Sequence, residues 1–279
     1  MRILVTGATG RIGARLIPRL LRGGDMVRIL VRDVQRADTL QSLGAEVAVG
    51  DLTNPVSLRD AVCGIDAIIH LAAFFRGANP AEVQRVNQDG TLALATLAIN
   101  TEIKRFVFLS TNLVYGPTNG TVLTEETPPH PATPYPMSKS AAEESLMELY
   151  RVRGLDLRIL RLAFVYGEGD PHLREGLSWF RQWNPNQPIH LLHHADVAQA
   201  IMLVVGKDGL HGQIYNVADD EPVKVGDVLR VYDEDPVEEA FSRPLNREWL
   251  QIMDTHKIHT LGFRPRFPSI QNAVLEDTL

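Results

Sequence analysis

The stretch that decides the fold is TGATGRIG, residues 6–13, which separates a short apolar run from a helical pattern. The run before it is rich in β-branched residues and predicts a strand, and residues 11–22 carry apolar side chains at helical spacing. Gly7, Gly10 and Gly13 lie between the two. In such a turn one glycine allows a sharp bend, another lets backbone N–H groups approach a pyrophosphate, and the last allows close helix–strand packing. The pattern therefore predicts a dinucleotide-binding turn.

Strand and helix patterns then alternate along the chain. Further strands are expected at residues 26–33, 45–51, 66–73, 105–111 and 155–167. Helices are expected at residues 34–44, 57–64, 80–100 and 138–154. Strands that are apolar on both faces and alternate with helices indicate a parallel sheet of right-handed βαβ units. The predicted fold class is α/β, a Rossmann-type doubly wound parallel sheet with a smaller C-terminal α/β domain.

The regular alternation ends after Gly167, which suggests a second domain. We expect an NAD(P)-binding domain at residues 1–166, with residues 194–207 returning to it as a helix. Residues 167–193 and 208–279 are expected to form the smaller, substrate-binding domain. A loop rich in Pro, Thr and Gly at residues 112–134 is too long for a simple connection, and such loops are usually functional.

Composition narrows the class of protein. The chain has 279 residues, 44% hydrophobic and 22% charged, and a formal net charge of −6, which favours neither nucleic-acid nor anionic-membrane partners. Its one cysteine, Cys63, excludes an internal disulfide and is expected to be a packed side chain in a reducing compartment. The N-terminal run is too short for a secretory signal, and no apolar window reaches membrane-spanning length. A cytoplasmic location is therefore expected.

Nine sequence motifs carry a family resemblance, and they occur in that family's order and spacing. They are TGATGRIG, GDL, HLAA, VNQDGT, STNLVYG, YPMSK, LRLAFVYG, HHADVAQA and YNVADDEP. Together they span most of the chain, and they resemble the extended short-chain dehydrogenase/reductases, in particular the NAD-dependent epimerase/dehydratase group. The resemblance implies an NAD(P) site. The residues expected to bind the cofactor are Gly7, Thr9, Gly10, Arg11, Ile12, Gly13, Arg32, Asp51, Leu52, Leu71, Ala72, Ala73, Asn87, Tyr135, Lys139, Leu162, Ala163 and Val165.

The end of the second predicted strand bears on the choice between NAD and NADP. An acidic residue there would accept hydrogen bonds from the adenosine 2′-OH, whereas an arginine suits a 2′-phosphate. The position that is acidic in NAD-binding relatives is Val31, followed by Arg32, and Arg11 in the glycine turn could reach the same phosphate. NADP is therefore favoured, although Asp33 leaves NAD open.

The motif YPMSK places Tyr135 and Lys139 four residues apart at the start of a helix. A tyrosine with an ordinary pKa near 10 is a poor base at neutral pH, and a lysine one helical turn away would lower that pKa. The resemblance implies that Tyr135 exchanges a proton with the substrate oxygen, that Lys139 also binds the nicotinamide ribose, and that Thr111 holds the same oxygen. Ser110 is the neighbouring hydroxyl, and strand alternation predicts that only one of the two serves.

Other positions depart from the relatives. Sugar dehydratases of the family carry Asp-Glu where this chain has Asn112 and Leu113, which argues against a 4,6-dehydratase. Epimerases usually have asparagine at the position of Phe164, and an apolar wall there suits a smaller or more hydrophobic carbonyl or alcohol. The residues expected near the substrate are Ser110, Asn112, Phe164, Tyr166 and His172. Histidines 193 and 194 lack metal-site spacing, so no metal is expected.

Three functions stay open at this stage. The first is an NAD(P)-dependent oxidoreductase that acts on a carbonyl or alcohol. The second is a nucleotide-sugar epimerase with the same catalytic residues, and the third is a regulator that binds NADP without chemistry. The expected partners are a small-molecule substrate and a second copy of the chain, because in the family the helices containing residues 90–100 and 140–150 pair across a two-fold axis.

Overall fold

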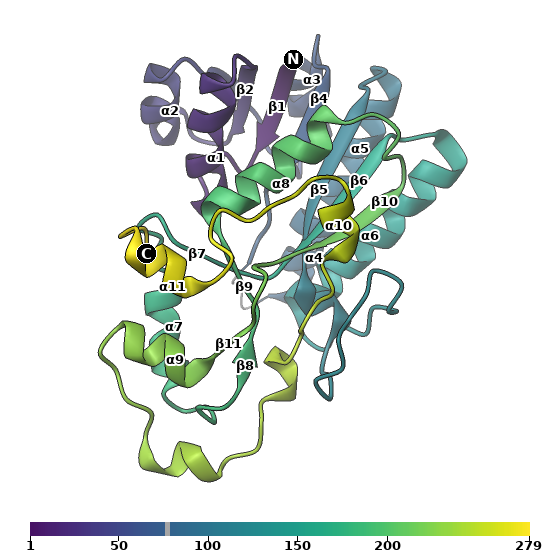
Figure 1. Ribbon diagram of the computed structural model, residues 1–279. Helices are drawn as coiled ribbons and strands as arrows, with labels where there is room; N and C mark the ends of the chain where they lie inside the picture. The colour runs from purple at the N-terminus through teal and green to yellow at the C-terminus, as the bar shows by residue number, and fades with distance from the viewer. Residues whose placement is uncertain (76–78) are drawn as a thin grey trace. The chain divides into compact units, whose positions relative to one another are not determined.

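The computed structural model describes residues 1–75 and 79–279 (Figure 1). The chain forms two compact units, each built from separated segments. Unit 1 contains Met1–Ser110, Thr133–Leu160 and Ile201–Ile214. Unit 2 contains Thr111–Ala132, Arg161–Ala200 and Tyr215–Leu279. These limits differ from the expected domain limits, and the assignment of cofactor and substrate to separate domains stays a prediction.

A seven-stranded sheet organises unit 1, in the order β10-β6-β5-β4-β1-β2-β3. Its strands are β1 (Arg2–Thr6), β2 (Met26–Val31), β3 (Glu46–Val49), β4 (Ala67–His70), β5 (Arg105–Thr111), β6 (Leu157–Leu162) and β10 (Gln213–Val217). Strand β1 runs parallel to β2 and β4, β2 to β3, and β4 to β5. This is the order of a Rossmann fold, so the predicted fold class is confirmed.

The sheet order reverses direction between β1 and β4, where Ile3 lies opposite Ala67 and Thr6 opposite His70. In open α/β sheets ligands bind at the carboxyl ends of the strands beside such a reversal. The glycine turn follows β1 and the HLAA segment follows β4, so the topology places both motifs at that edge.

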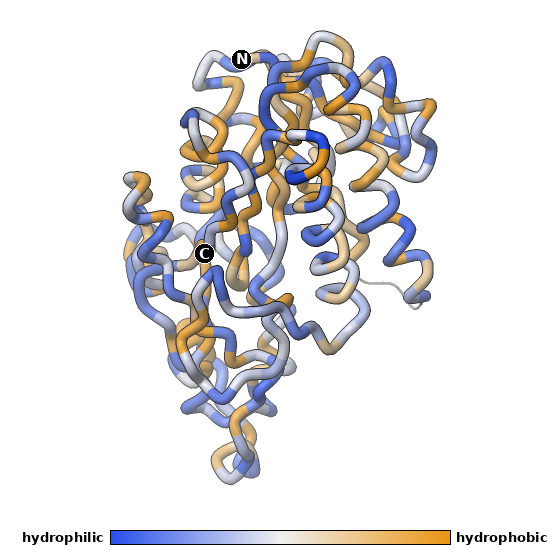
Figure 2. The backbone as a smooth tube through the Cα atoms, turned by 90° about the vertical axis from the view of Figure 1, so that its right-hand side faces the viewer, coloured by the Kyte–Doolittle hydropathy of each residue, from blue (hydrophilic) through white to orange (hydrophobic). Residues whose placement is uncertain are grey.

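The helices of unit 1 are α1 (Arg11–Arg22), α2 (Asp38–Ser42), α3 (Arg59–Val62), α4 (Pro80–Gln84), α5 (Gly90–Asn100) and α6 (Pro134–Arg153). Figure 1 shows α5 and α6 standing together against strands β4 to β6. There Leu94 of α5 and Leu146 of α6 belong to one buried cluster with Phe106 and Phe108 of β5. Orange and blue alternate along several helices in Figure 2, the pattern of helices that bury one side, whereas α5 is largely apolar.

Three elements differ from their expected form. The helix predicted at residues 80–100 is interrupted by a π-helical segment, Arg85–Asp89, between α4 and α5. The helix predicted at residues 34–44 begins as a 3-10 helix, Val34–Ala37, capped by the Asp33 carboxylate. The strand predicted at residues 155–167 is two strands, because β6 belongs to the main sheet whereas β7 (Phe164–Tyr166) pairs with β9. The strand breaks because its two halves pair with different strands, and the local sequence pattern does not encode those partners.

Unit 2 is built from short elements. They are the 3-10 helices Asn112–Tyr115, Glu238–Ser242 and Arg247–Trp249, strands β7, β8 (Pro188–Ile189), β9 (Leu191–His193) and β11 (Val223–Lys224), and helices α7 (His172–Phe180), α9 (Val225–Val231), α10 (His256–Thr260) and α11 (Ile270–Leu275). Helix α8 (His194–Gly206) begins in unit 2 and ends in unit 1. Strands β7 and β9 are parallel, and β8 and β11 antiparallel.

The long loop after β5 is anchored to a distant segment of unit 2. Thr118 Oγ1 donates to Leu250 O at 2.6 Å, Leu123 N donates to Ile252 O at 2.8 Å, and Gln251 Nε2 donates to Gly116 O at 2.6 Å. These contacts give the loop a defined position despite its lack of regular structure.

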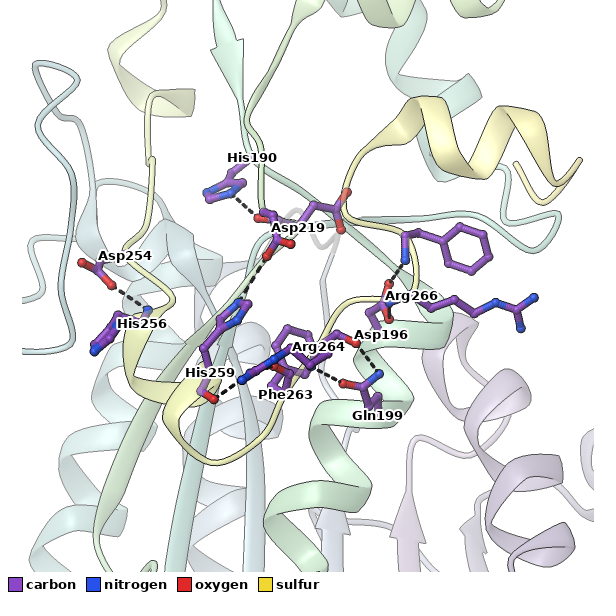
Figure 3. Close-up of polar contacts among 12 residues, drawn as sticks. His190, Asp196, Gln199, Asp219, Asp254, His256, His259, Phe263, Arg264 and Arg266 are labelled. Carbon is purple, nitrogen blue, oxygen red and sulfur yellow. Dashed lines mark hydrogen bonds and ion pairs between the residues drawn. The ribbon is translucent and has the colours of Figure 1, made fainter.

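A buried carboxylate and a nearby amide fix the C-terminal part of unit 2 (Figure 3). Asp196, fully buried in the first turn of α8, accepts hydrogen bonds from the backbone N–H groups of Arg266 at 2.7 Å and Phe267 at 3.0 Å. Three residues further on, Gln199 Nε2 donates to Arg264 O at 2.8 Å. The motif HHADVAQA therefore holds the segment at residues 264–267 in place.

Cys63 directly follows helix α3. Its side chain is exposed, not packed as expected, because α3 ends there and the chain turns at Gly64, which has a positive φ of 68°.

Within the part of the chain that the structure describes, no helix has the length and apolar character needed to cross a membrane.

Candidate functional site

The glycine turn has the geometry of a phosphate cradle. Gly7 has a φ of 68°, and a Cβ there would lie 2.6 Å from Ala72 N at the end of β4. A Cβ on Gly13 would lie 2.5 Å from Ala8 O. At Gly10, by contrast, a Cβ would meet only Gly7 O at 3.1 Å. The fold itself therefore requires Gly7 and Gly13, whereas a Cβ on Gly10 would have one tight contact, with Gly7 O, and would otherwise stand beside the N-terminus of α1, where a pyrophosphate would fit.

Three charged residues expected near the cofactor follow the ends of two strands: Arg32 and Asp33 follow β2, and Asp51 follows β3. Arg32 is exposed just after β2, and Asp33 Oδ1 accepts the Gln35 N–H at 3.0 Å. Asp51 Oδ1 accepts hydrogen bonds from Thr53 N and Thr53 Oγ1, both at 2.8 Å. These bonds, followed by the nearby charges of Arg32 and Arg85, lower the pKa of Asp51. Arg32 is thus exposed, and the Asp33 carboxylate is engaged in capping the 3-10 helix Val34–Ala37.

The pair Tyr135 and Lys139 lies in the first turns of α6, which begins at Pro134, earlier than the predicted start at residue 138. The Tyr135 ring is half-buried and meets the edge of Phe75, with ring centroids 4.8 Å apart. The Lys139 side chain is almost fully buried, and its Nζ lies 3.9 Å from the centroid of the Phe108 ring. Helical spacing thus places phenol and ammonium on one side of the helix, as the motif predicted.

Burial dominates the titration of this pair. It raises the pKa of Tyr135 to about 12 and lowers the pKa of Lys139 to about 7. We expected Lys139 to lower the pKa of Tyr135, and in this structure the loss of water around the phenol has the larger, opposite effect. Tyr135 therefore stays protonated at neutral pH, which suits a proton donor.

Sequence reasoning missed several residues around the pair. Glu143, one further turn along α6 and only 3% exposed, acts on the Lys139 pKa in the direction that raises it. Its i+4 spacing from Lys139 was a signal that could have been used. Phe75 and Ser138 also contact this region, and nothing in their local sequence marks them.

The two hydroxyls at the end of β5 have different surroundings. Ser110 shares its strand face with Phe106 and Phe108, the face covered by α6, and its buried Oγ has no hydrogen-bond partner among residues 1–75 and 79–279. Thr111 points to the other face and its Oγ1 accepts the Leu113 N–H at 3.2 Å, which caps the next 3-10 helix. Of the two, Ser110 is the one whose oxygen is buried without a partner in the described part of the chain, and which of them serves stays a prediction.

Phe164, expected near the substrate, belongs to an aromatic cluster in unit 2. Its ring stacks on His172 with centroids 4.3 Å apart and planes at 16°. Trp249 lies 6.1 Å from Phe164, and Trp183 lies 5.6 Å from Trp249. His172 and both tryptophans are half-buried, so the cluster reaches the surface of the unit. The local sequence did not connect these residues, because they come from four separate segments.

Other predicted positions are enclosed by the protein itself. Tyr166 is fully buried and its OH donates to Asp219 Oδ2 at 3.2 Å, so the structure places it in the interior of unit 2 and not at a surface facing a substrate. Asn112 is buried next to Thr111. The Asn87 side chain is also occupied: Oδ1 accepts the Phe74 N–H at 2.6 Å, and Nδ2 donates to Phe74 O at 3.1 Å and to Ser138 Oγ at 2.9 Å.

Histidines 193 and 194 point to separate partners. His194 Nε2 lies 2.7 Å from Asp170 Oδ2 in a buried pair, and His193 Nε2 lies 3.1 Å from Thr278 O. Among the described residues no three His, Cys, Asp or Glu side chains gather as a metal site.

Comparison with known proteins identifies the family. The profile of the NAD-dependent epimerase/dehydratase family matches residues 3–218. The chain belongs to this family. It is therefore an enzyme of the NAD(P)-dependent oxidoreductase or epimerase class, within the extended short-chain dehydrogenase/reductases.

Two curated relatives of this family member have names that describe reductive or sterol chemistry. A 4-hydroxy-2-methyl-3-oxo-4-farnesyl-3,4-dihydroquinoline-1-oxide ketoreductase of Stigmatella aurantiaca is 30% identical over 240 residues, covering 82% of this chain and 71% of the relative. Sterol demethylase protein B of Methylococcus capsulatus is 35% identical over 175 residues, covering 61% of this chain but only 53% of the relative.

A solved structure extends the likeness to the whole chain. A dTDP-glucose 4,6-dehydratase from Streptomyces venezuelae, solved with NAD bound, superposes with a TM-score of 0.82 and 25% identity, covering 99% of this chain and 95% of the dehydratase. This family member thus has both ketoreductase and nucleotide-sugar dehydratase relatives. The choice between these activities depends on the residues of its own site.

Proposed function

We propose that this family member is an NAD(P)-dependent ketoreductase, with NADP favoured, that reduces a carbonyl group on an apolar, ring-containing substrate. The observation that carries the proposal is the pair Tyr135 and Lys139 at the start of α6, with the phenol half-buried and the amine almost fully buried. A bound nicotinamide dinucleotide would supply or accept the hydride. The glycine turn fits such a cofactor, because Gly10 lacks a side chain beside the N-terminus of α1, where a Cβ would otherwise meet only Gly7 O.

The chain's own residues would handle the proton. Tyr135, whose pKa burial raises to about 12, is protonated at neutral pH and can donate to a substrate oxygen that gains charge during reduction. Oxidation of an alcohol would need the phenolate, which burial disfavours. Lys139 would stabilise the tyrosinate left after transfer, and Thr111 or Ser110 would hold the oxygen. These roles favour the reductive direction.

The substrate class is inferred from unit 2. The half-buried rings of His172, Trp183 and Trp249, which pack around the buried Phe164, offer flat surfaces to stack against a ring. Both curated relatives carry names that refer to large apolar ring systems, a farnesylated quinoline and a sterol. Asn112 and Leu113 cannot act as the acids that sugar dehydration requires. These features support an apolar carbonyl over a nucleotide sugar.

A substrate screen tests this proposal. NADPH oxidation would be followed with cyclic ketones, steroid ketones and quinolones, and with UDP- and dTDP-sugars as the opposing set. We expect turnover with at least one apolar ketone and none with the sugars. Epimerisation of a sugar by tightly retained cofactor, without net NADPH loss, would instead identify an epimerase. Cofactor binding without turnover of either set would identify a regulator.

Arg32 is expected to set the cofactor preference. Its exposed guanidinium can pair with a 2′-phosphate, so we expect NADPH to bind more tightly than NADH and Arg32→Ala to weaken NADPH about tenfold while leaving NADH nearly unchanged. Fluorescence titration of both cofactors measures this. Arg36→Ala, an exposed arginine in the following 3-10 helix, is the matched control. Equal affinities for the two cofactors in the unmodified protein would contradict the assignment.

Lys139 is expected to give the reaction a pH limit. Its pKa, lowered from 10.5 to about 7 by burial, means that the amine is charged below that pH and neutral above it. If the charged form assists Tyr135, kcat/KM for reduction should fall as pH rises through about 7, by up to tenfold per pH unit. The Lys139→Met variant should lose this limb. A flat profile from pH 6 to 9 would show that Lys139 keeps one charge state throughout.

We also propose a homodimer through α5 and α6. Leu92 on α5 is 38% exposed although the helix is largely apolar, and Met137 at the start of α6 is 53% exposed. Light scattering should give twice the 31.0 kDa of one chain, and a monomeric mass would remove the proposal.

A further inference from the structure

A buried histidine connects two motifs that the proposed mechanism treats separately. His70, the last residue of β4, is fully buried. Its Nδ1 lies 2.6 Å from the Oγ1 of Thr6, the residue just before Gly7 in the glycine turn. Its Nε2 lies 2.8 Å from the Oγ1 of Thr91 on α5. The His70 ring therefore connects the start of the glycine turn with helix α5.

The hydrogen bonds around His70 have a direction. Thr91 Oγ1 donates its only hydrogen to Asn87 O at 2.7 Å, so it must accept from Nε2–H of His70. Nδ1 is then unprotonated and accepts from the Thr6 hydroxyl, whose oxygen in turn accepts the Ala72 N–H at 3.2 Å. Burial, with a smaller contribution from the Lys139 charge, lowers the pKa of His70 to about 3 and keeps the ring neutral in this arrangement.

The hydrogen-bonded connection continues to helix α6, which carries Tyr135 and Lys139, through Asn87. Its Nδ2 donates to Ser138 Oγ at 2.9 Å, and Ser138 Oγ donates to Tyr135 O at 2.7 Å. Asn87 lies in the π-helical segment Arg85–Asp89, and single turns of this kind often occur at functional sites. The extra residue in that turn sets where the Asn87 side chain meets α6.

A second contact route joins His70 to Lys139. The His70 ring stacks on Phe108 with centroids 5.7 Å apart and planes at 27°. Phe108 also contacts Lys139, whose Nζ lies 3.9 Å from the ring centroid. His70 is thus held against the same aromatic ring that positions the lysine.

We propose that His70 is a positioning residue that couples occupation of the glycine turn to the placement of Tyr135 and Lys139, through Thr6, Thr91, Asn87 and Ser138. The proposal rests on the proposed function for the identity of the catalytic pair, but not for the network itself. A shift of the turn on cofactor binding would move Thr6 and hence the ring. The first two turns of α6 would then receive that shift through Ser138 and Phe108.

The state of His70 can be measured without any assay of activity. In nitrogen-15 spectra of the full chain, assigned by comparison with His70→Gln, we expect the Nε2–H tautomer with no titration between pH 5 and 8. Addition of NADPH should change the His70 shifts. An Nδ1–H tautomer, a midpoint near the ordinary histidine pKa, or shifts unaffected by saturating NADPH would overturn the proposal. Each of these results is independent of whether a ketone is reduced.

Variants separate positioning from simple support of the fold. His70→Phe keeps an aromatic ring against Phe108 but removes both hydrogen bonds, and we expect about tenfold weaker NADPH binding together with about tenfold lower kcat. His70→Gln, which retains one donor and one acceptor, should recover part of both. A lower melting temperature with NADPH affinity and kcat unchanged would reduce His70 to a structural residue and overturn the proposal.

A double-mutant cycle tests the coupling along the network. Thr6→Val and Ser138→Ala alter its two ends, and their effects on NADPH affinity should be non-additive by at least threefold. Thr96→Val is the matched control on α5, because among the described residues its hydroxyl bonds only within its own helix, to Leu92 O at 2.8 Å. Thr96→Val should combine additively with Thr6→Val. Additive behaviour of the Thr6 and Ser138 pair would contradict the proposed coupling.

Discussion

Replacing Tyr135 with phenylalanine is expected to lower kcat for carbonyl reduction by about 10² to 10⁴, the range typical for loss of a general acid. The substitution removes only the hydroxyl. The ring that meets Phe75 edge-on at 4.8 Å stays, so the start of α6 should keep its structure. Because burial raises the phenol pKa to about 12, the Tyr135 hydroxyl is protonated across the working pH range. The loss of activity in Tyr135→Phe should therefore be seen at every pH in that range.

The matched control for this variant lies on the same helix. Tyr150 is near the far end of α6, where its ring packs against Gly212, so Tyr150→Phe makes the same chemical change away from the proposed site. We expect Tyr150→Phe to keep full activity and Tyr135→Phe to keep NADPH affinity within about threefold while losing turnover. Full activity of folded Tyr135→Phe on a substrate found by the screen would refute the proposed mechanism.

The second large effect is expected from the glycine turn, where two alanine substitutions should fail for different reasons. In Gly13→Ala the new Cβ would lie 2.5 Å from Ala8 O and closer still to Gly7 O, which forces helix α1 away from β1. Overpacking of this kind should lower the free energy of unfolding by about 3 kcal/mol. In Gly10→Ala the Cβ meets only Gly7 O, at 3.1 Å, and the backbone φ of −81° suits alanine.

Gly10→Ala should therefore fold with a smaller loss of stability than Gly13→Ala, since only Gly7 O has to shift, but should bind NADPH at least tenfold more weakly, because the Cβ stands where the pyrophosphate would approach. Thermal or urea unfolding and cofactor titration on both variants separate the two effects. Ala14→Gly in the same helix provides a control, since it removes an exposed Cβ and should only cost about 1 kcal/mol of helix stability. Unchanged NADPH affinity in Gly10→Ala would show that the phosphate site lies elsewhere.

The local pattern predicted the elements that depend on sequence neighbours. Alternating apolar strands and helices gave the Rossmann-type sheet, since both periodicities are visible in residues 2–111. The spacing of Tyr135 and Lys139 gave their shared helix side. The pattern failed where a partner strand or a third residue decided the outcome, as in the break between β6 and β7 at Ala163 and the exposed position of Cys63.

The pKa values of Tyr135 and Lys139 could not be predicted from the sequence either. The motif suggested that Lys139 would lower the pKa of Tyr135, but the pKa depends on how much water the fold removes from each group. That amount is set by Phe75, Phe108 and the helix layer, which arrive from distant parts of the chain. The same holds for Tyr166, expected near a substrate and found bonded to Asp219 in the interior of unit 2.

By itself the sequence determined the family, the fold class and the residue types available for cofactor binding and proton transfer, because these are encoded in short motifs whose residues are neighbours along the chain. Only the tertiary structure decided which side chains are buried and what they bond to. It closed Thr6, His70, Thr91, Asn87 and Ser138 into one hydrogen-bonded network. Those residues come from β1, β4, the π-helical segment, α5 and α6, and only packing of the sheet against its helices brings their polar groups within bonding distance.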